Sequence, residues 1–66
     1  MMFGIQVKVF NPHLKEYEWL WAHASGSTTP YAWKDENKAH YMKGMMYPES
    51  SSDFVRVQQY DDVSLI

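Results

Sequence analysis

The sequence contains no cysteine, which excludes disulfide bonds and every zinc site built on thiolates. A chain of 66 residues without these links must be stabilised by bulky side chains or by self-association. It also lacks an apolar run of the roughly 20 residues that cross a bilayer, and it opens with no signal-like segment. These absences predict one small domain, residues 1–66, that resides in the cytoplasm and does not insert into a membrane.

An excess of charge of one sign is missing as well. The 6 basic and 8 acidic residues give a formal net charge of −2, and neither sign dominates a long segment. The chain as a whole is therefore not expected to be steered toward phosphate groups.

The residues that enzymes and metal sites need occur in no recognisable arrangement. His13, His23 and His40 share no metal-ligand spacing, and no glycine-rich phosphate loop precedes a helix. Serines and threonines cluster in 25–29 and 50–52, where loop chemistry explains them better than a nucleophile with its base. The sequence predicts no catalytic residue, no metal, no cofactor and no enzymatic activity. The alternative left open is a metal site assembled across the fold from His13, His23 and an acidic residue.

Alternating apolar and polar residues predict three strands. Residues 3–10, 15–22 and 53–60 each show the period of two that marks a strand with one buried face. Between the second and third strands, Asp35 is a suitable helix N-cap, and Pro48 ends the helix. This order predicts an α+β fold, ββαβ, with a three-stranded antiparallel sheet and one helix packed on one face.

The predicted core lies where the helix covers the sheet. The second strand alternates Trp19 and Trp21 with glutamates, so the tryptophans are expected to meet the valines of the first strand. Glu16 and Glu18 are expected to face solvent and to neutralise Lys8 across the hairpin. Trp19→Ala is then predicted to cost about 3–5 kcal/mol, enough to unfold a small domain. The expected core positions are Ile5, Val7, Val9, Trp19, Trp21, Val55 and Val57 beneath Ala39, Met42 and Met46.

More amphipathic apolar side chains are present than a core of this size needs. Those that flank elements, rather than lying at periodic core positions, are predicted to form a partly exposed patch. A patch of tryptophan, tyrosine and arginine is typical of protein interfaces, so the sequence predicts a partner-binding surface. Its expected residues are Tyr31, Trp33, Tyr47 and Phe54, with Arg56 at the rim.

An ordered series of short motifs follows the aromatic-rich hairpin. It consists of Tyr31-Ala32-Trp33, Asp35-Glu36-Asn37-Lys38-Ala39, Tyr47-Pro48 and Val55-Arg56-Val57. This order resembles that of small phage-encoded inhibitors of bacterial RNA polymerase or other host machinery. The resemblance implies a small modulator that binds a bacterial host protein in the host cytoplasm and occludes part of its surface. It implies no individual functional residue.

A second interpretation is a module that binds single-stranded nucleic acid. Aromatic residues gather near Lys8, Lys15 and Lys34, and rings on a sheet stack bases. The net charge of −2 and the expected use of these rings in the core favour the protein-binding interpretation.

Self-association is also expected. One helix leaves one face of the sheet bare, and the apolar residues 63–66 are suited to pair along an exposed edge. A homodimer is therefore predicted, with residues 61–66 forming either a disordered end or a short edge strand.

Overall fold

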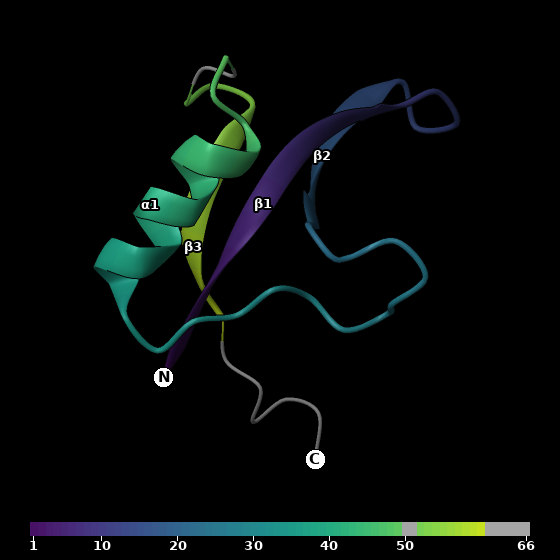
Figure 1. Ribbon diagram of the computed structural model, residues 1–66. Coiled ribbons are helices and arrows are strands. Elements are labelled where there is room, and N and C mark those ends of the chain that lie inside the picture. Colours follow the sequence, from purple (N-terminus) through teal and green to yellow (C-terminus); the bar gives the residue numbers. More distant parts are fainter. Residues whose placement is uncertain (50–51, 61–66) are drawn as a thin grey trace.

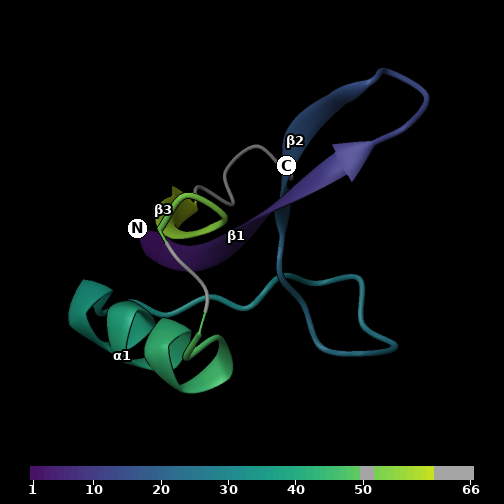
Figure 2. The same cartoon turned by 90° about the horizontal axis from the view of Figure 1, so that it is seen from above.

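The structure is a computed structural model that describes residues 1–49 and 52–60. Its elements are β1 (Met2–Asn11), β2 (Glu16–Trp21), α1 (Glu36–Met46) and β3 (Val55–Tyr60). The central strand β1 pairs antiparallel with both neighbours, in the order β2-β1-β3 (Figure 1). The helix α1 lies on one side of this sheet (Figure 2). These observations confirm the predicted α+β fold with a three-stranded antiparallel sheet and one helix.

The C-terminal residues 61–66, predicted to be a disordered end or an edge strand, lie outside the described residues. The dimer contact predicted for residues 63–66 therefore stays a prediction.

The loop of residues 12–15 joins β1 to β2 and sets the register of the hairpin. The Asn11 side-chain oxygen accepts hydrogen bonds from the backbone N–H groups of His13, at 2.9 Å, and Leu14, at 3.3 Å. Lys15 completes the turn with a φ of 56°, in the left-handed region that few side chains adopt. Asn11 and Glu16 consequently face each other at the loop end of the hairpin.

This register places Trp19 and Trp21 on the face opposite to the predicted one. Trp19 pairs with Lys8 and Trp21 with Gln6, so both rings share a face with the polar residues of β1. The prediction that the tryptophans meet the valines beneath the helix is therefore wrong. A shift of pairing by one residue moves every side chain of a strand to the other face, and the loop length decides this shift.

The glutamates of β2 are also displaced from their predicted position. Glu18 faces Val9 and Glu16 faces Asn11, on the side of the sheet where α1 lies. The Asn11 side-chain amide donates a hydrogen bond of 3.3 Å to a Glu18 carboxylate oxygen. The predicted neutralisation of Lys8 by these glutamates is wrong, because Lys8 points to the other face.

The core lies between α1 and the β1–β3 pair. On this side Ile5 of β1 faces Val57 of β3, and both are predicted core positions. Ile5 and Ala39 are 0% exposed and Val55 is 2% exposed. Val9, which was predicted to be a core residue, is 41% exposed. The reason is that α1 packs on β1 and β3, while the hairpin extends past the helix (Figures 1 and 2).

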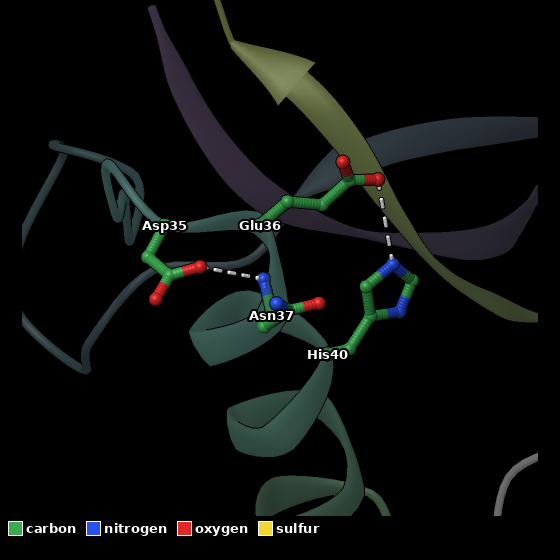
Figure 3. A network of polar contacts seen from close by, with 4 residues as sticks. All are labelled: Asp35, Glu36, Asn37 and His40. Atoms are coloured by element: carbon green, nitrogen blue, oxygen red, sulfur yellow. Dashed lines mark hydrogen bonds and ion pairs between the residues drawn. The ribbon is translucent and has the colours of Figure 1, made fainter.

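The helix begins where the sequence predicts. The Asp35 carboxylate accepts a 2.9 Å hydrogen bond from the Asn37 backbone N–H, which is the N-cap interaction (Figure 3). Glu36 and His40, one turn apart, approach within 3.6 Å between Oε2 and Nε2 on the exposed surface. At the other end the Tyr47 N–H donates to the Lys43 carbonyl, and Pro48 follows.

Gly44 is a position where the helix can be strengthened. A Cβ atom added at Gly44 would have no heavy atom within 4 Å, outside the helix's own backbone. We therefore expect Gly44→Ala to raise the free energy of unfolding by about 0.4–1 kcal/mol, measured by urea denaturation. Gly26→Ala is the control, because Gly26 has a φ of 82° and alanine there is strained. A Gly44→Ala variant less stable than the wild type would contradict the open environment of this residue.

The segment between β2 and α1 returns to the sheet rather than leaving it. The Ala22 N–H donates to the Ile5 carbonyl, and the Tyr31 N–H donates to the Ala22 carbonyl. Phe3 and Trp33 then exchange two backbone hydrogen bonds, of 2.7 and 2.8 Å. Because facing residues of an antiparallel pair share a face, Trp33 lies on the side of Phe3 and Ile5.

Candidate functional site

The face of the sheet that points away from α1 carries most of the aromatic side chains of the strands. We call it the open face. Phe54, directly before β3, belongs to it, because the Lys8 N–H donates a 2.7 Å hydrogen bond to the Phe54 carbonyl and extends the ladder. The pairing of β1 with β2 and β3 assigns to the open face Met2, Gly4, Gln6, Lys8, Phe10, Tyr17, Trp19, Trp21, Phe54, Arg56, Gln58 and Tyr60.

Arg56 is held at the centre of the open face by two neighbours. Its Nε donates a 2.9 Å hydrogen bond to the Gln6 side-chain oxygen, and Gln6 is only 9% exposed. Its guanidinium carbon lies 3.9 Å from the centre of the Trp19 ring, well within the range of a cation–π interaction. Arg56 is thus positioned in advance of any ligand.

Lys8 stands among exposed rings. Its Nζ lies 5.2 Å from the centre of the Tyr17 ring and 5.9 Å from that of Phe54. Phe10 packs edge-on against Tyr17 at 5.2 Å between ring centres. Tyr17, Phe54 and Phe10 are 56%, 49% and 48% exposed, so much of each ring remains accessible to a ligand.

The other end of the open face is held together by Trp21. Its ring meets the ring of Tyr60 edge-on, with centres 5.0 Å apart. The glycine at position 4 makes this possible, because a Cβ atom there would lie 2.9 Å from Trp21 Cζ3 and 2.8 Å from the Tyr31 carbonyl oxygen. Such distances are shorter than real Cβ atoms show, so Gly4 is required for the Trp21 ring to lie across β1.

The charges of the strands are segregated between the two faces. Both charged residues among the strand positions of the open face, Lys8 and Arg56, are cations, and no described strand position of this face is an aspartate or glutamate. Glu16 and Glu18 point to the other side. The described strand positions of the open face therefore carry a net positive charge, although the chain has a formal net charge of −2.

The residues predicted to form one partner-binding patch lie in two separate places. Tyr31 and Trp33 stack with ring centres 5.9 Å apart, and both pack against the core cluster of Ile5, Ala22 and Val55. Tyr47 also packs against that cluster. Phe54 and Arg56 are on the open face instead. The structure thus does not bring the five predicted residues together.

Sequence reasoning did not place Gln6, Lys8, Trp19 and Trp21 on one face with Arg56. The signal that would have found them is the hairpin register. Asn11 and Glu16 flank the loop of residues 12–15 and pair with each other. In this register Trp19 faces Lys8 and Trp21 faces Gln6, so both tryptophans lie on the face of Lys8.

Within residues 1–49 and 52–60 there is no pocket and no group of three or more His, Asp or Glu residues that could hold a metal ion. The only described helix is too short to span a membrane. Comparisons of the chain with protein-family models, with curated proteins and with solved structures found no match.

Proposed function

We propose that this protein is a non-enzymatic cytoplasmic domain that binds single-stranded nucleic acid on the open face of its sheet. The observation that carries the proposal is the arrangement of partly exposed rings around Lys8 and Arg56, with no carboxylate among the strand positions that the structure describes on that face. The argument that favoured the core for these aromatics does not apply to Trp19 and Trp21, since their rings lie on the face away from α1.

The chemistry of the open face fits a single strand better than a duplex. Unpaired bases expose their flat faces, and stacking of one base on an aromatic side chain contributes about 1–3 kcal/mol. Tyr17 and Phe54 are each about half exposed, at 56% and 49%, and the Lys8 ammonium group lies over both rings, where it can meet the phosphate of a strand whose bases contact them. A duplex would present only its backbone to this flat surface.

Tryptophan fluorescence tests the proposal directly. Titration with a random-sequence strand of about 12 nucleotides should quench the emission, because Trp19 and Trp21 lie where bases would stack. Trp33 packs against the core and should contribute little, so Trp33→Phe should keep the quenching. A titration that leaves the emission unchanged, while a labelled strand also shows no binding, would overturn the proposal. Tighter binding of a duplex than of the single strand would also count against it.

Salt dependence gives a quantitative prediction. If Lys8 neutralises one phosphate, this contact should make the logarithm of the binding constant fall with the logarithm of salt concentration with a slope of about −0.7. Lys8→Ala should reduce the size of this slope by about 0.7, while Lys38→Ala, on the exposed surface of α1, should leave it unchanged. Equal effects of the two variants would show that binding depends on overall charge and not on the open face.

A second candidate is the protein-binding function implied by the resemblance to phage-encoded inhibitors. The observation that favours it is the exposure of two apolar residues on the helix side of the hairpin, Val9 at 41% and Leu20 at 46%, beside Glu18. Leu20→Lys should then abolish capture of a bacterial protein from lysate, whereas Tyr17→Ala should not. Loss of capture with Tyr17→Ala alone would place the protein partner on the open face instead.

A further inference from the structure

The most specific polar feature of the open face is the pair formed by Arg56 and Gln6. The hydrogen bond between them uses Arg56 Nε and the Gln6 oxygen, at 2.9 Å. It leaves the two terminal nitrogens of the guanidinium, the fork that recognises paired acceptors, for a ligand. Because Gln6 is nearly buried and Trp19 lies 3.9 Å below the guanidinium, this fork keeps its position without a ligand.

Every polar group that this pair offers to a ligand is a donor. Arginine has no acceptor, and the Gln6 oxygen is occupied by Arg56, so only the Gln6 amide N–H groups remain. A base that meets the pair must therefore present acceptors. Guanine presents N7 and O6 side by side with no donor between them, whereas adenine places an amino group beside N7. Thymine has its oxo groups separated by an N–H, and cytosine carries its adjacent acceptors, N3 and O2, on its Watson–Crick edge instead.

We infer that the Arg56–Gln6 pair gives the open face a preference for guanine over adenine and thymine within a single strand. A guanine stacked on a neighbouring ring turns its O6 and N7 edge toward the Arg56 fork, and Gln6 acts as the positioning residue that holds the fork. This inference rests on the proposed function, because it requires a base to lie on the open face. A fixed arginine also loses less side-chain freedom on binding than a mobile one.

The test compares two strands of about 12 nucleotides, one of thymines alone and one with single guanines separated by thymines. Lithium buffer prevents guanine quartets from forming. The guanine strand is expected to bind about tenfold tighter, the usual size of one bidentate contact between arginine and guanine. Replacing guanine by 7-deazaguanine removes the N7 acceptor and should remove most of this preference.

Two variants assign the preference to its residues. Arg56→Lys keeps the positive charge but lacks the fork, so it should bind both strands with similar affinity. Gln6→Met keeps the size of the side chain and removes the acceptor that holds Arg56. It should weaken the guanine preference, and a Gln6→Met variant that keeps the full preference would contradict the positioning role of Gln6. A preference that survives Arg56→Lys would overturn the role given to the fork.

The two proposals fail in different ways. Equal affinity of the wild type for both strands, with binding that still depends on the aromatic residues of the open face, overturns the guanine preference alone. Absence of binding to either strand overturns the proposed function, and the guanine preference falls with it.

Discussion

Ile5→Ala is expected to leave most of the protein unfolded at room temperature. Ile5 is 0% exposed and lies with Ala22 and Val55 in the core cluster. Truncating a buried isoleucine to alanine costs about 2–5 kcal/mol, because it removes apolar contacts and leaves a cavity. A domain of 66 residues has a total stability of about 3–10 kcal/mol, so the loss is comparable with the whole. Far-ultraviolet circular dichroism during urea denaturation measures this loss in the free energy of unfolding.

Val9→Ala is the matched control, on the same strand and the same face. Val9 is 41% exposed beyond the end of α1, so its truncation should cost about 1 kcal/mol or less. Trp19→Ala should also remain folded, because the ring lies on the open face and not beneath the helix. A Trp19→Ala variant that unfolds as completely as Ile5→Ala would contradict the placement of this tryptophan.

Local patterns in the sequence were sufficient to predict the elements of this fold. The alternation in each strand depends only on neighbouring residues, and so does the N-cap interaction of Asp35 with Asn37. Which face of β2 meets the core depends instead on the number of residues between the strands. The hydrogen bonds from His13 and Leu14 to the Asn11 side chain, with Lys15 in the left-handed region, determine that number. The alternation of residues within each strand carries no information about the length of the loop between the strands.

The candidate site was harder to predict because long-range pairing assembles it. Arg56 and Gln6 are 50 residues apart in the sequence and adjacent in the sheet. Trp33 was expected at an exposed surface because it flanks the helix, yet its backbone pairs with Phe3 at the start of the chain. Composition identified the residue types that a binding surface needs. The pairing of β1 with β2 and β3 determines which of these residues share a face of the sheet.

The double variant Tyr17→Ala/Phe54→Ala is expected to lose about thirtyfold or more in affinity for a single strand. Each of these rings is about half exposed beside Lys8, at 56% and 49%, so each is placed to stack one base. The loss corresponds to two stacking contacts of about 1–3 kcal/mol each. Removal of exposed rings should change the free energy of unfolding by only about 0.5 kcal/mol each. Fluorescence anisotropy of a labelled strand and a parallel urea titration separate binding from stability.

Tyr41→Ala/Met45→Ala is the control that removes a similar amount of exposed apolar surface. Tyr41 and Met45 are 65% and 63% exposed on α1, which lies across the sheet from the open face (Figure 2). This variant should bind the strand as the wild type does, because no base stacked on the open face reaches the helix. If both double variants lose affinity equally, the strand is attracted by exposed apolar surface in general. If only the helix variant loses affinity, nucleic acid binds beside α1, and the rings around Lys8 have no part in binding.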